Sequence, residues 1–480
     1  MYIYSRTYNL LVFGSRLKIQ RRQKLHVRQY LTKLVPVLAL PAPSAKLWRP
    51  GLLLVVLSPL FFYPANITEE LTKTRTGTTA NYVNGFGHKL ITQMMMDDED
   101  KNVIISPTGI AGLLAMTLLG TVGRSYDELA DTLGFSRDVR SNLKNHEEFG
   151  NLLRSLNGNG LSKTVYADVV LIDTHVKLRD AYREFLRRVY DGDALSIDFG
   201  DRNSAKETIN KWVSEHTMDK ISEFLKEPLP ADTRAVLLSA LYFASQWQTP
   251  FIPEFTNKMT FKKPGQSVMA DLMLNLGEFN YTDSHENGLQ MIALPYNDSV
   301  TTLYALKPKY PKDTSIKELL SKLDFEQIDR LIDEMKVQKV VVRFPKMELQ
   351  SSTNLEGAMK RIGIETIFRP KLANFALMID TNMVANKTEN EILARIHDDD
   401  DVGLNRIINS LPNPDVHIDS IIHDVRITIN EYGTEAVAAT AGVLAKTAEQ
   451  FYADSPFYMF IRNENTKLVT FSAIINDPTT

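Results

Sequence analysis

The pattern of small residues in 431–442 is the most informative feature of this sequence. This segment reads Glu-Tyr-Gly-Thr-Glu-Ala-Val-Ala-Ala-Thr-Ala-Gly and follows a β-competent stretch, 424–430. Successive side chains of an extended strand point to opposite faces, so one face carries only small side chains and the other carries the charge of Glu435. The small face holds Thr434, Ala436, Ala438, Thr440 and Gly442. Such a strand suits packing over a core, and the same composition also suits a flexible, solvent-exposed connector.

Signatures of catalysis are missing. The sequence has no Gly-x-Ser-x-Gly nucleophile elbow, no His-Glu-x-x-His zinc helix and no phosphate-binding loop ending in Gly-Lys-Ser/Thr. His146-Glu147-Glu148 lacks the second histidine and is typical of a solvated helix face. The absence of cysteine excludes disulfides, thiolate metal sites and cysteine nucleophiles. These absences do not exclude an enzyme, but no motif proposes one, and we expect no metal and no cofactor.

Charge is distributed unevenly along the 480 residues. Residues 1–68 hold ten Lys or Arg and no acid, which leaves 45 basic against 58 acidic residues in 69–480, a charge of about −13. Because phosphates repel an acidic body, this composition argues against nucleic-acid binding. Hydrophobic residues make up 44% and charged residues 24%, the balance of a globular protein.

The N-terminal extension, 1–65, contains an apolar run at Gly51–Tyr63. A bilayer core needs roughly 20 apolar residues, so this run is too short for a stable membrane span and fits a secretory signal cleaved after Ala65. A signal anchor and an organelle transit peptide remain as alternatives. Three N-glycosylation triplets begin at Asn66, Asn297 and Asn386 and agree with a secreted, extracellular glycoprotein.

The remaining residues show helical and strand patterns without a repeat. Helices are predicted at 81–96 and 110–119, the second with Ser106-Pro107 at its start. Strands are predicted at 164–173, 236–243 and 339–344, and a closing hairpin at 457–461 and 468–475. Helices gather early and strands late, which favours an α+β fold. An inserted acidic loop, 381–417, contains the run Asp398–Asp401.

The chain resembles the serpin family over nearly all of 80–480, and in particular secreted inhibitory serpins of invertebrates. The resemblance rests on ordered blocks: Asn102–Pro107, Leu118–Gly123, Ile209–Val213, Leu241–Trp247, Leu294–Tyr296, Phe344–Lys346, Asn354–Leu355, Gly363–Ile364 and Phe451–Ile461. It implies a single domain at 81–480 with three β-sheets, eight to nine helices and an exposed reactive loop, preceded by a polar leader at 66–80.

By this resemblance, 431–455 is the hinge and reactive loop of a serine protease inhibitor. The hinge pattern of inhibitory members is met by Glu431, Gly433, Thr434, Ala436, Ala438 and Ala439. The family mechanism implies cleavage of the loop by the protease, a covalent acyl complex and insertion of the loop as a new strand. A non-inhibitory serpin acting as a carrier or chaperone is the alternative, and a secreted hydrolase is disfavoured by the missing nucleophile motif.

The resemblance leaves two positions for the reactive bond. The usual family spacing places it at Thr447–Ala448, and Lys446–Thr447 is one residue earlier. Lysine suits the acidic pocket of trypsin-like proteases, and threonine suits an elastase-like pocket better.

A polar cluster beneath the opening sheet is also implied, at Ser106, Ser239 and His423. The family normally has Asn in place of Ser239 and Ser in place of Gly109, so we expect easier sheet opening and a monomer at risk of polymerisation. The acidic insertion is either a tolerated surface loop or a docking site for a basic protease surface. The sequence has no basic helix patch of the kind that would indicate activation by a glycosaminoglycan, so we expect no such activation.

Overall fold

A computed structural model of the chain describes residues 65–96, 101–137, 139–156, 162–263, 265–381, 408, 411–433 and 448–480. The chain divides into two compact units, residues 1–70 and 71–480. Only residues 65–70 of the first unit are described, and they form the start of helix α3. No described helix combines the length and the apolar character that a membrane span requires.

Helix α4 lies at the centre of the helical layer. Pro107 occupies its first turn, and the Ser106 hydroxyl caps it by accepting a hydrogen bond from the Gly109 amide at 3.1 Å. Its residues from Pro107 to Leu118 are all buried, as expected of a helix that is apolar on every side. The nine α-helices of the described residues are α3 (Ala65–Met95), α4 (Pro107–Leu119), α5 (Gly123–Leu133), α6 (Val139–Ser155), α7 (Asp180–Tyr190), α8 (Arg202–His216), α9 (Ile316–Ser321), α10 (Phe325–Glu334) and α11 (Glu356–Ile362).

The strands of the described residues form three sheets. A five-stranded sheet has the order β11 (Met347–Asn354), β13 (Ser420–Ile429), β5 (Ala235–Ser245), β2 (Ser162–Asp173) and β4 (Asp193–Ile197). A nine-stranded sheet has the order β1 (Val103–Ile105), β16 (Val469–Ile475), β15 (Phe457–Asn463), β9 (Thr301–Pro308), β8 (Leu289–Pro295), β7 (Gln266–Ser284), β10 (Lys336–Pro345) and β14 (Glu449–Tyr452), with β6 (Ile252–Lys263) also paired to β7. β12 (Ile379–Asp380) and β3 (Lys177–Leu178) form the third.

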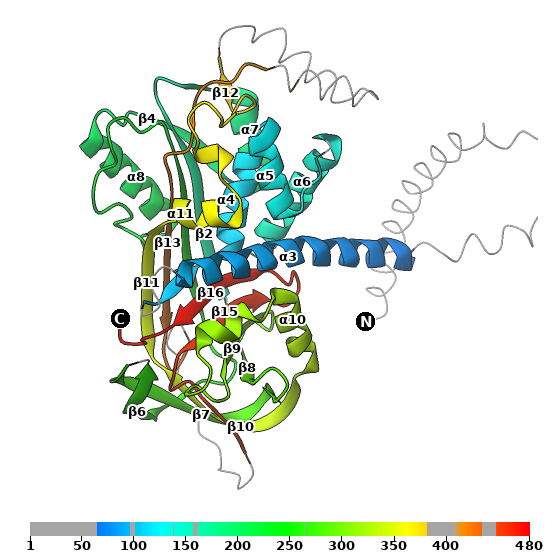
Figure 1. Cartoon of the computed structure of the whole chain (residues 1–480), viewed down its shortest axis with the longest axis vertical. Coiled ribbons are helices and arrows are strands. Elements are labelled where there is room, and N and C mark those ends of the chain that lie inside the picture. The colour runs from blue at the N-terminus through cyan, green and yellow to red at the C-terminus, as the bar shows by residue number, and fades with distance from the viewer. Residues whose placement is uncertain are drawn as a thin grey trace, which may run out of the picture. The chain divides into compact units, whose positions relative to one another are not determined.

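The pairing of β13 with β5 matters most for function. These two strands are parallel neighbours, in register from Ser420 opposite Val236 to Ile427 opposite Phe243. β5 is antiparallel to β2 on its other side. The sheet stands between α8 on one side and α4 on the other (Figure 1). β13 ends at Ile429, directly before the predicted hinge.

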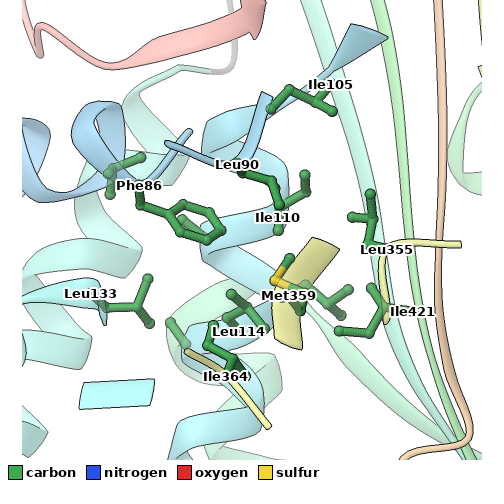
Figure 2. Close-up of a cluster of buried hydrophobic side chains, with 14 of the residues drawn as sticks. Phe86, Leu90, Ile105, Ile110, Leu114, Leu133, Leu355, Met359, Ile364 and Ile421 are labelled. Atoms are coloured by element: carbon green, nitrogen blue, oxygen red, sulfur yellow. The ribbon is translucent and has the colours of Figure 1, made fainter. Parts of the chain in front are cut away.

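The core consists of separate apolar clusters on the two faces of the five-stranded sheet. The first lies between the helices and one end of the sheet face that is turned toward α4, here called the inner face. Figure 2 shows Leu114 and Ile421 within this cluster. The second joins the other end of the inner face to the nine-stranded sheet and includes Leu241 and Val425. A third, under α8, covers the outer face. Ser239 lies in β5 two residues before Leu241, so a polar position separates the first two clusters.

The predicted α+β class, the three sheets and the helix number are confirmed in the described residues. The predicted strands and the closing hairpin are found as β2, β5, β10, β15 and β16. The first helix begins earlier than its apolar pattern indicates, because α3 extends from Ala65 through the polar stretch 66–80. The last part of 431–455, Glu449–Tyr452, is strand β14. Most of the acidic insertion 381–417, including Asp398–Asp401, lies outside the described residues.

Candidate functional site: the hinge and the polar cluster beneath the sheet

Glu431 anchors the end of β13 to the neighbouring strands. Its Oε2 lies 3.1 Å from Lys346 Nζ, and its Oε1 accepts a hydrogen bond from the Thr256 hydroxyl at 2.9 Å. The Phe251 amide donates to the Glu431 carbonyl at 2.7 Å. Burial alone raises the pKa of Glu431, but its backbone amide, Lys346 and Thr256 together bring the pKa below its ordinary value. The hinge glutamate is therefore an ionised clamp at the start of the loop.

Gly433 is required by the close approach of the backbone. Its φ is 122°, a backbone conformation that residues other than glycine rarely adopt. A Cβ at this position would lie 2.3 Å from the Ser245 carbonyl oxygen and 2.7 Å from Gln246 Cα. Both contacts are with backbone, so neither can move aside cheaply. Glycine is thus the residue that lets the chain leave β13 beside the end of β5.

Trp247 fixes this turn from the other side. Its backbone amide donates to the Tyr432 carbonyl at 3.0 Å, and its indole Nε1 donates to the Asn430 carbonyl at 2.9 Å. Its ring stacks on Tyr296 with centroids 4.4 Å apart and an interplanar angle of 13°. The hinge therefore starts from a position that is held by backbone, side-chain and ring contacts.

The rest of the predicted hinge and most of the reactive bond lie outside the described residues. These are Thr434, Ala436, Ala438, Ala439, Lys446 and Thr447. Ala448 is described, is partly buried and immediately precedes β14, which runs parallel to β10. The undescribed stretch 434–447 thus connects the end of β13 in one sheet to the start of β14 in another.

The structure brings the predicted cluster of Ser106, Ser239 and His423 together beneath the sheet. His423 Nε2 accepts a hydrogen bond from the Ser106 amide at 2.8 Å, and the Ser106 hydroxyl donates to the Thr470 carbonyl at 2.8 Å. His423 and Ser239 are register partners in β13 and β5. Burial lowers the pKa of His423 to about 3, against a smaller opposing effect of the Ser239 backbone. The imidazole is therefore neutral at physiological pH, with its proton on Nδ1.

One member of this cluster was missed by the sequence analysis. Asp168 in β2 is the register partner of Ser239 and extends the polar row to a third strand. The signal in the sequence was an aspartate in the middle of the mostly apolar strand 164–173, which also ends in Asp173. Gly109 of α4 faces the same row, because a Cβ there would lie 3.2 Å from Ser239 Oγ.

The predicted glycosylation positions differ in what the structure describes. Asn297 is exposed in the turn between β8 and β9. Asn66 lies in the first turn of α3, and its side chain is not described. Asn386 lies outside the described residues.

Comparison with known proteins agrees with this geometry. A family model described as serpin (serine protease inhibitor) matches residues 81–478. The chain is 30% identical to serine protease inhibitor 28Dc of Drosophila melanogaster over 79% of this chain and 76% of that protein. It is 26% identical to plasminogen activator inhibitor 1 of Mus musculus, over 84% and 94% of the two chains.

Solved structures with the same fold include human thyroxine-binding globulin in complex with thyroxine. It gives a TM-score of 0.71 at 19% identity, covering 84% of this chain and 99% of that one. Native protease nexin-1 with heparin gives a TM-score of 0.69 at 23% identity, with 84% and 99% covered. The family match, the curated relatives and the arrangement of hinge, loop and sheet lead to one conclusion. The chain belongs to the serpin family, whose members are described as serine protease inhibitors rather than enzymes.

Proposed function

We propose that this serpin inhibits a serine protease by a single-use trap in which the cleaved loop inserts between β5 and β13. The observation that carries the proposal is the run of small residues in 434–442 directly after the anchored hinge. A segment that follows β13 and folds back runs antiparallel to both β13 and β5. Since these two strands are parallel to each other, the new strand pairs with both in the same way.

The free energy that strand insertion releases is large enough to disturb the catalytic groups of the protease. Around ten new ladder hydrogen bonds at ~0.5–1.5 kcal/mol each give on the order of 10 kcal/mol. This is comparable with the barrier lowering that a protease obtains from its positioned catalytic groups. Dragging the acylated serine out of place with that energy stalls deacylation and leaves a covalent complex.

The two candidate reactive bonds, Lys446–Thr447 and Thr447–Ala448, both lie next to β14. Cleavage at either bond leaves the C-terminal fragment held in the sheet by the pairing of β14 with β10. The N-terminal part of the loop is then free to move with the end of β13. A trypsin-like target fits the first bond and an elastase-like target fits the second.

We also propose that the protein acts outside the cell after removal of its N-terminal extension at Ala65. The apolar run Gly51–Tyr63 and the exposed sequon at Asn297 support this placement. The alternative of a non-inhibitory carrier draws no support from the likeness to thyroxine-binding globulin, because 19% identity carries the fold alone. The small-residue hinge argues against it, since a carrier has no need of an insertable strand.

Strand insertion is tested by a matched pair of arginine substitutions. Thr434→Arg places a charge on the face that must enter the core, at a cost of several kcal/mol, on the order of burying an unpaired polar group. Val437→Arg adds the same charge to the opposite face of the strand. Each variant is incubated with trypsin and, because trypsin also cleaves after an introduced arginine, with elastase, and the products are resolved on denaturing gels.

We expect the Thr434 variant to be cleaved without trapping the protease, and the Val437 variant to keep forming covalent complexes. Covalent trapping by Thr434→Arg at the original stoichiometry would contradict strand insertion.

A further inference from the structure

A row of three polar side chains crosses the seam at which β5 and β13 must separate. Asp168 of β2 pairs in register with Ser239 of β5, and Ser239 pairs with His423 of β13. Register partners in adjacent strands present their side chains on the same face. That face is turned toward α4, because a Cβ on Gly112 would lie 3.5 Å from Asp168 Oδ2.

The row is incompletely hydrogen bonded. Among the described residues, Asp168 Oδ1, Ser239 Oγ and His423 Nδ1 are shut off from solvent and make no hydrogen bond. Part of Asp168 remains accessible, but the shielded oxygen is the one without a donor. Burial raises the pKa of Asp168 to about 7, although the nearby Ser239 hydroxyl lowers it in part. Such unsatisfied groups are uncommon inside native proteins and call for an explanation.

No positive charge compensates Asp168 among the described groups that face it. α4 contributes Ser106, Gly109 and Gly112, and α6 contributes the apolar Leu153 beside Gly112. The other titratable groups on this face are two residues with neutral side chains. They are Tyr166, which burial and Asp168 keep protonated, and His423, which burial keeps unprotonated.

The charged neighbours on β13 lie on the other face of the sheet. Asp424 follows His423 in the strand and therefore points away from α4, and its Oδ1 pairs with Arg426 Nε at 3.1 Å. An ionised Asp168 thus has no cation beside it among the described residues, and its shielded Oδ1 has no donor, which is costly.

We propose that Asp168 of β2, one strand away from the seam, is a protonation-controlled latch for the separation of β5 and β13. The neutral carboxyl leaves the closed sheet stable, and the ionised carboxylate favours separation of the two strands. Separation lets water or an incoming strand reach the row and solvate the charge. The inference rests on the proposed function, since strand insertion requires this seam to open.

The size of the effect follows from linkage. A carboxyl that titrates near 7 in the closed sheet and near its ordinary value once solvated binds more protons in the closed form. The stability of the closed sheet is therefore greatest at low pH and is lost as the pH rises through about 7. Between pH 6 and pH 8 the opening equilibrium should increase about tenfold, and the factor is nearly the same for any open-state pKa well below 6.

His423 acts in the opposite direction. Once solvated, an imidazole takes up a proton near pH 6.5, so acid pH favours opening through this residue. Its contribution is the same in the wild-type protein and in any variant of Asp168. The ratio of the two opening constants at each pH therefore isolates the carboxyl.

Hydrogen exchange of the full chain, read by mass spectrometry at pH 6 and pH 8, measures the opening directly. Exchange of the β5 and β13 amides is corrected for the intrinsic chemical rate and compared between the wild-type protein and Asp168→Asn. Asparagine keeps the shape of aspartate and cannot ionise. Asp168→Ser provides the same comparison if the asparagine variant fails to fold.

We expect the wild-type-to-variant ratio of opening constants to rise about tenfold from pH 6 to pH 8 in β5 and β13, and to stay constant in the β15 and β16 hairpin. A constant ratio at the seam overturns the latch. An equal rise in the hairpin also overturns it, because the charge would then act on global unfolding.

Trapping of trypsin, elastase and chymotrypsin is measured separately on the same preparations. A tenfold ratio without any covalent complex leaves the latch standing and refutes the proposed function. Formation of a covalent complex together with a constant ratio supports the proposed function and refutes the latch.

Discussion

Replacing Glu431 by lysine should loosen the point at which the reactive loop leaves β13. Glu431 has a side-chain exposure of 9% and contacts Lys346, which is 49% exposed. An ion pair so exposed contributes about 0.5–1 kcal/mol. The hydrogen bond from Thr256 contributes about 1 kcal/mol. Two lysines side by side add about 1 kcal/mol of repulsion near the surface. The free energy of unfolding should therefore fall by roughly 2–3 kcal/mol.

The assay is urea unfolding of four proteins: the wild type, Glu431→Lys, Lys346→Glu and the charge-swapped double variant. If the two side chains interact as the distance indicates, the double variant regains about 1 kcal/mol relative to the sum of the single changes. Heat-induced polymerisation on native gels should accelerate in Glu431→Lys and slow again in the swap. A double variant whose loss equals the sum of the two single losses would refute the ion-pair argument.

Three further outcomes are expected. Ser239→Asn supplies amide donors beside Asp168 Oδ1 and should slow sheet opening; unchanged inhibition stoichiometry together with unchanged heat-induced polymerisation would show that the cluster does not control opening. His146 is fully buried in α6, so the interpretation of His146-Glu147-Glu148 as a solvated helix face is wrong for this residue. Burial lowers the pKa of His146 to about 3, so the folded chain loses stability as the pH falls below about 6.5. In urea, His146→Gln should therefore lose about 2 kcal/mol less than wild type between pH 7 and pH 5, and equal losses would contradict this. Deleting 388–415 should slow protease association at low salt, and an unchanged rate constant would leave the acidic insertion without a docking role.

Local patterns in the sequence predicted most elements of the fold. The Ser106-Pro107 start of α4 was legible because capping and proline placement act within one helical turn. The strands β2, β5 and β10 were legible because their apolar residues run together. The early start of α3 could not be predicted, because the polar stretch 66–80 has no apolar periodicity that indicates a helix.

Contacts between distant segments were beyond the reach of those patterns. Asp168 joins Ser239 and His423 only because β2, β5 and β13 are neighbours in the sheet, and that order is set by the packing of the whole domain. The ion pair of Glu431 with Lys346 likewise joins residues of different elements. The resemblance to serpins predicted the cluster and the hinge, whereas the unpaired carboxyl became visible only in the structure.

The central claim is that the loop traps a protease as a covalent acyl complex. The direct measurement is incubation of the protein with trypsin, elastase and chymotrypsin, followed by denaturing gels and mass spectrometry of the released C-terminal fragment. We predict a complex that resists denaturant and a fragment that begins at Thr447 or Ala448. Complete cleavage within the loop with no such complex for any of the three proteases would contradict the account.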